Sequence, residues 1–197
     1  MISVCVAHYK ENLDWIKNIK YCVDIISKQE YKEDEAPNKG NEASSYLEYI
    51  IKHYDNLSDY NIFVHGHRNS WHHNENMDDR INRLVFDKEY YNLNENTMCT
   101  FGNNDMIIYR MIDDIAKILN TKINPYHLWF TGSAQFYVCR NNILKHSKQT
   151  YIELYNYLMN TKETSEYSGR AFEFIWHFIF TGSHTEIINL EDVKINP

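Results

Sequence analysis

The sequence lacks the features that would place it in several large classes of protein. Its four cysteines form no CxxC pair, so neither a zinc–thiolate site nor a dithiol redox motif is expected. No Lys/Arg stripe reverses the formal net charge of -7, which argues against a nucleic-acid partner. No apolar stretch is long enough to span a membrane, and MISVCVAHYKEN lacks the basic start of a signal peptide. We therefore expect a soluble cytoplasmic protein with no membrane span.

The chain also lacks internal boundaries. No Pro/Gly/Ser-rich or charged linker and no internal repeat divides its 197 residues, so we expect a single domain over residues 1–183 and a C-terminal tail over 184–197. Aromatic residues are plentiful, with sixteen tyrosines. They favour either an aromatic-lined cleft that holds sugars or bases, or a core rich in tyrosine.

Short apolar runs alternate with helical patterns, which predicts an α/β fold. Buried strands are predicted at residues 2–7, 21–26 and 61–65, because each is a short apolar run that ends in polar residues. The clearest helix of the first half begins after Asn41, where Tyr46, Leu47, Ile50 and Ile51 share one face. Further helices are predicted at residues 105–119, 150–159 and 169–180.

The segment FVHGHRNSWHH, residues 63–73, begins within the third predicted strand and continues past its end. His8 and Tyr9 follow the first predicted strand in the same way. Ligands of open α/β sheets bind outside the carboxyl ends of the strands, so these two segments are candidates for one site.

The histidines of this segment allow three interpretations. His65 and His67 would face opposite ways on a regular strand, unless Gly66 bends the backbone and brings both rings to one side. Two imidazoles with a carboxylate or a third imidazole would then suit a divalent transition metal. Alternatively, His67, Arg68 and Trp71 contact phosphate or sugar hydroxyls, or the segment is only a structured polar loop.

Two further motifs carry polar groups that could act in a site. NKGNE, with Asn38, Lys39, Gly40 and Glu42, precedes the clearest helix, where it provides either a helix cap or a site for phosphate or ribose. Glu173 interrupts the apolar helix RAFEFIWHFIF. Burial would raise its pKa and suit it to act as a general base, whereas pairing with Arg170 or solvation would make it structural. His177, one turn later, could share a site with Glu173.

Five ordered blocks resemble an uncharacterised domain family of fungi, bacteria and large DNA viruses. The blocks are AHYKENLDWI, NKGNEASSYLEYIIKHYDNL, FVHGHRNSWH, SAQFYVCRNNI and FEFIWHFIF, and they cover nearly the whole chain. The order of the blocks is similar, more distantly, to that of glycosyltransferases of the GT-A type. This likeness implies a Rossmann-like mixed sheet flanked by helices, a nucleotide-sugar donor and a carbohydrate acceptor.

The GT-A likeness also implies roles for individual residues. Glu173 would be the catalytic base, and His65 and His67 would stand where an Asp-x-Asp motif holds Mn²⁺, or alternatively Mg²⁺ or Zn²⁺. The donor would contact Tyr9, Glu11, Asn38, Lys39, Gly40, Glu42 and Arg68. The acceptor would contact Trp71, Gly132, Ser133, Gln135 and Trp176.

His-Gly-His departs from that pattern, because imidazoles are neutral and softer than the carboxylates that hold hard divalent ions. Three explanations stay open: manganese is bound partly by imidazole, Arg68, Lys39 and protonated histidine neutralise the diphosphate without metal, or the transferase activity has been lost. The alternatives to a transferase are a metal-dependent hydrolase built on the histidines and a non-catalytic carbohydrate-binding or interaction module.

Overall fold

The computed structural model describes residues 1–70, 75–94, 98–99, 106–124, 128, 130–132 and 134–184. Its strands are β1 (Ile2–His8), β2 (Cys22–Ser27), β3 (Tyr60–His65), β4 (Tyr90–Asn92), β5 (Met98–Cys99), β6 (Phe130–Thr131) and β7 (Phe136–Cys139). Its α-helices are α1 (Glu42–His53), α2 (Met77–Arg83), α3 (Met106–Ile118), α4 (Arg140–Ile143), α5 (Lys148–Asn160) and α6 (Ser165–Thr181). Two 3₁₀ helices are η1 (Asp14–Asn18) and η2 (Tyr54–Asn56).

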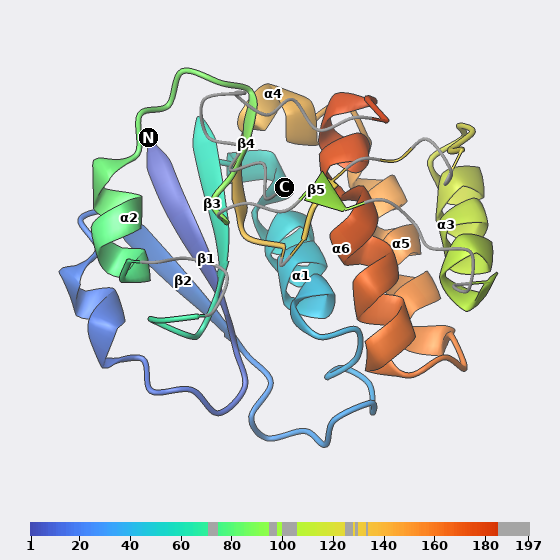
Figure 1. Cartoon of the computed structure of the whole chain (residues 1–197), viewed down its shortest axis with the longest axis horizontal. Helices are drawn as coiled ribbons and strands as arrows, with labels where there is room; N and C mark the ends of the chain where they lie inside the picture. Colours follow the sequence, from blue (N-terminus) through green and yellow to red (C-terminus); the bar gives the residue numbers. More distant parts are fainter. Residues whose placement is uncertain are drawn as a thin grey trace, which may run out of the picture.

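A five-stranded mixed sheet, in the order β2-β1-β3-β7-β4, forms the centre of the fold. β2 and β3 both pair in parallel with β1, whereas β7 is antiparallel to β3 and β4 is antiparallel to β7. Figure 1 shows α2 and η1 on one side of this sheet and α1, α3, α5 and α6 on the other. The predicted α/β fold, with a mixed sheet flanked by helices in one domain, is confirmed.

Alternation along the strands supplies one apolar core on each face of the sheet. Val4 and Val6 pack toward α2 and η1 with Ile62 and Val64, while Cys5 and Phe63 pack toward the larger helical layer. This is the side-chain period of two that a strand covered on both faces requires. Such strands appear in the sequence as continuous apolar runs.

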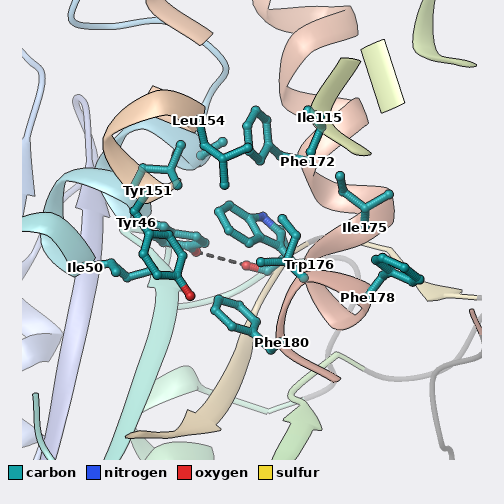
Figure 2. Packing of buried hydrophobic residues seen from close by; sticks show 14 of the residues in the cluster. Tyr46, Ile50, Ile115, Tyr151, Leu154, Phe172, Ile175, Trp176, Phe178 and Phe180 are labelled. Carbon is teal, nitrogen blue, oxygen red and sulfur yellow. Dashed lines mark hydrogen bonds between the residues drawn. The ribbon is translucent and has the colours of Figure 1, made fainter. Parts of the chain in front are cut away.

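The larger core is rich in aromatic rings. Trp176 stacks on Phe180 with ring centroids 5.8 Å apart, and Tyr46 packs edge-on against Phe63 at 5.1 Å. Figure 2 shows Trp176 in the middle of this cluster, close to Tyr46 and Phe180. Tyr46 and Tyr151 are fully buried in this core, and Tyr137 is fully buried in the smaller one, so the tyrosine-rich core is confirmed for these residues.

The order of the strands places a ligand-binding position at one end of the sheet. The chain goes from β1 to β2 on one side, then returns through α1 to β3 on the other side of β1. The carboxyl ends of these three parallel strands lie beside the N-terminal end of α1, at the bottom of Figure 1. Reversal of the strand order at this point separates the connecting segments and leaves a crevice.

Among the described residues, no helix is long and apolar enough to cross a membrane. The predicted tail, 184–197, lies outside the described residues except for His184.

Candidate functional site

A cavity of about 330 Å³ opens at the carboxyl ends of β1 and β3. The end of β1 contributes Tyr9 and Glu11 to its wall, and the end of β3 contributes His65 and His67. The start of α1 contributes Glu42. The structure thus brings together the polar segments that the sequence placed after the first and third strands, with both histidines lining one cavity.

Further polar residues complete the wall of the cavity. They come from the end of β1, the segment between β2 and α1, and the first residue of α6: His8, Lys28, Glu33, Asn38, Asn41 and Ser165. Of these six, the sequence marked His8 and Asn38. Ser165 lies more than a hundred residues from the others, and no periodicity or motif links it to them.

Glu11 is held firmly at the mouth of the cavity. Its Oε2 accepts hydrogen bonds from the backbone N–H groups of Tyr9 (2.7 Å) and Lys10 (3.0 Å), and its Oε1 lies 3.6 Å from His67 Nε2. A Cβ at Gly66 would lie 2.8 Å from Glu11 Oε2, so only glycine permits this approach. The side chain of His67 is 60% exposed, which places this pair at the solvent edge of the cavity.

Glu42, the first residue of α1, lies deeper. Its Oε2 is 3.8 Å from His65 Nε2, and its side chain is 13% exposed. Burial, and to a smaller extent the nearby charge of Glu173, together raise the pKa of Glu42 to about 8. A carboxyl group with such a pKa exchanges its proton near neutral pH.

Glu173 projects from α6 toward Glu42 and Gly132. A Cβ at Gly132 would lie 3.0 Å from Glu173 Oε1, so the backbone of the Gly132 segment packs directly against this carboxyl group. Arg170, the predicted structural partner of Glu173, lies 3.7 Å from Glu166. Glu173 is partly buried and lies beside Glu42, whereas Glu42 itself lines the cavity.

Buried amides fix the backbone behind these two carboxyl groups. Gln135, which is 1% exposed, accepts a hydrogen bond from the backbone N–H of His65 (3.2 Å) and donates one to Asn94 (2.9 Å). Asn94 in turn donates to the carbonyl oxygen of Gly132 (2.9 Å). Gln135 therefore supports the site from behind. No local pattern in the sequence indicates Asn94, because Gly132 and Gln135 lie about 40 residues away along the chain.

The segment before α1 also departs from the predicted cap. Asn41 makes no side-chain cap, since its Nδ2 donates to the carbonyl oxygen of Ser165 (3.4 Å). Gly40 has φ +73°, and a Cβ there would lie 2.5 Å from Leu158, so this position requires glycine. The backbone N–H of Gly40 donates to Ser165 Oγ (2.9 Å), which ties the segment to α6.

Several predicted site residues do not line the cavity. Lys39 donates from Nζ to the carbonyl oxygen of Thr161, and Arg68 forms two 2.9 Å hydrogen bonds with Asp78. Trp176 is 1% exposed in the core. His177 is buried against His184, with its pKa lowered to about 4 by burial. Trp71 and Ser133 lie outside the described residues.

The metal site predicted at His65 and His67 does not appear as a cluster of ligands within the described residues. Within the described part of the chain, no group of three or more His, Cys, Asp or Glu side chains is arranged to hold a metal ion. His65 Nε2 and His67 Nε2 lie near different carboxylates, at 3.8 Å from Glu42 and 3.6 Å from Glu11. A divalent metal at these histidines therefore stays a prediction.

These features define an α/β protein with a polar cavity, lined by carboxyl and imidazole groups, at the switch point of its sheet. A model of the family described as "Protein of unknown function (DUF3431)" matches residues 4–193. The chain therefore belongs to this family, and the predicted membership of an uncharacterised domain family is confirmed. No curated protein and no solved structure matches the chain.

Proposed function

We propose that the protein transfers a sugar from a nucleotide-sugar donor to a hydroxyl group of a carbohydrate acceptor. The observation that carries the proposal is Glu42, a cavity-lining carboxyl group whose pKa is raised to about 8 by burial and by Glu173. A general acid or base acts best when its pKa lies near the working pH. The resemblance of the sequence blocks to GT-A glycosyltransferases selects glycosyl transfer among the reactions that such a group can assist.

The paired carboxyl groups explain how the proton would move. Two neighbouring carboxyl groups resist double ionisation, so Glu42 keeps its proton to a higher pH than a lone carboxyl group would. The acceptor oxygen would form a bond to the anomeric carbon as the bond from that carbon to the diphosphate breaks. Its proton would pass to Glu42 in the molecules in which this carboxyl group is ionised, a fraction that grows as the pH approaches its pKa of about 8, and the diphosphate would leave with the bonding electrons.

The lining of the cavity supports roles for the two glutamates that differ from those implied by the GT-A likeness. The GT-A likeness made Glu173 the base and placed Glu42 beside the donor, but Glu42 is the one that faces the cavity. We therefore assign direct proton transfer to Glu42. Glu173 would set the charge and pKa of Glu42 from behind. These steps use only the carboxyl groups of the protein and the two substrates.

The test separates donor binding from transfer. Transfer is measured by the release of nucleoside diphosphate from a panel of nucleotide sugars, with simple sugars as acceptors. Binding is measured by the thermal midpoint of the protein with each donor. Glu42→Gln should lower the transfer rate by about 100- to 10,000-fold, the range typical of general acid–base catalysis, while donor stabilisation persists. The exposed Glu30 supplies the control substitution, Glu30→Gln.

Two results would count against the assignment. A Glu42→Gln protein that transfers sugar at the wild-type rate has no need of this carboxyl group. Equal loss of donor binding and of transfer would instead make Glu42 a binding residue.

A further inference from the structure

The cavity wall offers mainly hydrogen-bond acceptors. Glu33, an exposed residue on the rim, makes no hydrogen bond or ion pair within the described part of the chain. Asn38 and Asn41 both use their amide N–H groups internally, on the carbonyl oxygens of Tyr31 and Ser165, each at 3.4 Å. Their amide oxygens accept no bond from any described residue. These oxygens, with the carboxyl groups of Glu33, Glu11 and Glu42, are the acceptors that the wall presents to a ligand.

Two basic side chains of the wall, Lys28 and His8, already have partners within the protein. Lys28, which is 4% exposed, pairs through Nζ with Glu48. His8 uses both ring nitrogens, Nδ1 with Ser27 Oγ at 2.9 Å and Nε2 with the carbonyl oxygen of Glu11 at 3.3 Å. Lys28 is the only lysine or arginine among the described residues that line the cavity.

Such a wall suits a ligand that brings hydroxyl groups. Each hydroxyl donates one hydrogen bond and can satisfy a carboxylate or amide oxygen, whereas phosphate oxygens at neutral pH mainly accept. Phosphate groups in this cavity would face carboxylates, and among the described lining residues no unpaired lysine or arginine would neutralise them. The volume of about 330 Å³ lies near the lower end of the range for small-molecule pockets, which suits one sugar-sized ring.

We infer that the cavity binds a hydroxyl-rich ring, either a free sugar unit or the ribose of a nucleoside, and leaves phosphate groups outside. The inference rests on the proposed function only where it treats the ring as part of a donor. Glu33 would be a specificity-determining residue, because its carboxylate accepts hydrogen bonds from the ring at the rim. Any diphosphate would then lie beyond His67, at the solvent edge.

The experiment compares ring-bearing and phosphate-bearing probes on the intact protein. The ring probes are methyl glucoside, glucosamine, uridine and guanosine, and the phosphate probe is inorganic diphosphate. Each is titrated at millimolar concentration while amide NMR shifts and the thermal midpoint are followed. We expect at least one ring probe to bind and inorganic diphosphate neither to bind nor to displace it. Glycosides and nucleosides form separate arms, so the result also identifies the source of the ring.

Glu33→Gln is the matched test of the site, with Glu30→Gln as its control, because both glutamates are exposed in the same segment and only Glu33 lines the cavity. Glu33→Gln should raise the Kd of the bound ring about tenfold, as expected for loss of a hydrogen bond to a charged group. Glu30→Gln should leave it unchanged.

Displacement of the ring by inorganic diphosphate, absence of binding by every ring probe, or equal Kd values for the two variants would overturn the inference. These outcomes are distinct from failure of the proposed function. A ring that binds as expected, in a protein that transfers no sugar, removes the transferase proposal and keeps this one.

Discussion

Replacing Glu42 with glutamine should make the protein more stable above about pH 5, by an amount that grows with pH. The ordinary pKa of a glutamate is 4.5, and burial with the neighbouring Glu173 raises that of Glu42 to about 8. Below the lower value both the folded and the unfolded chain hold this proton, so it has no effect on stability. Between the two values only the unfolded chain releases it, and the folded state loses stability as pH rises.

The size of the effect follows from the two pKa values. A difference of one pKa unit corresponds to about 1.4 kcal/mol. Glu42 should therefore lower the free energy of unfolding by about 1 kcal/mol at about pH 5, about 3 kcal/mol at about pH 7 and about 5 kcal/mol at about pH 9. Glutamine has nearly the same shape and no proton to lose, so the variant escapes this penalty.

Urea denaturation of the wild type and the Glu42→Gln variant across this pH range measures the difference directly. Glu30→Gln, at an exposed position, controls for the loss of one carboxylate. The stability gap between Glu42→Gln and the wild type should widen steadily from acid to neutral pH and level off above about pH 8. A gap that stays constant with pH would mean that Glu42 titrates like an exposed glutamate, and the reasoning would be wrong.

Three further changes test parts of the same account. Glu173→Gln should lower the pKa of Glu42 below 8 but keep it above 4.5, because burial is the larger cause; carbon-13 NMR of the Glu42 carboxyl group measures this. His177→Leu should remove a loss of stability that develops as pH falls from 6.5 toward 4, seen by denaturation at acid pH. Gln135→Leu should lower the free energy of unfolding, measured by urea denaturation, by about 2–4 kcal/mol. The substitution leaves the backbone N–H of His65 and the side-chain amide oxygen of Asn94 without their partner.

The three parallel strands of the sheet and the helices α1, α3, α5 and α6 could be predicted because their patterns are local. The run at residues 2–7 became β1 (Ile2–His8), and the run at 61–65 became β3 (Tyr60–His65). Strands covered on both faces must be apolar throughout, so a short apolar run with polar ends identifies them. The position of the site followed from the same runs, since the residues after two parallel strands meet at one edge of a sheet.

The contents of the site could be predicted only in part, because several of them depend on partners far apart in the sequence. Lys39 and Arg68 look available for phosphate, yet Thr161 and Asp78 engage them. Trp176 lies on a helix that is apolar nearly all round, so periodicity cannot show which side faces the core.

The proximity of Glu42 and Glu173 is a further tertiary fact. More than a hundred residues separate the two glutamates, and only the packing of α6 beside α1 brings their charges together. No local pattern around either residue contains this information. The raised pKa of Glu42 therefore had no sequence signal, although each glutamate was a candidate on its own.

The most direct test of the central claim is the release of nucleoside diphosphate by the purified protein, with a panel of nucleotide sugars and sugar acceptors. The wild type should release diphosphate from at least one donor. Glu42→Gln should lose this activity while that donor still raises its thermal midpoint. No release from any donor, or equal release by the wild type and Glu42→Gln, would contradict the claim that this cavity carries acid–base glycosyl transfer.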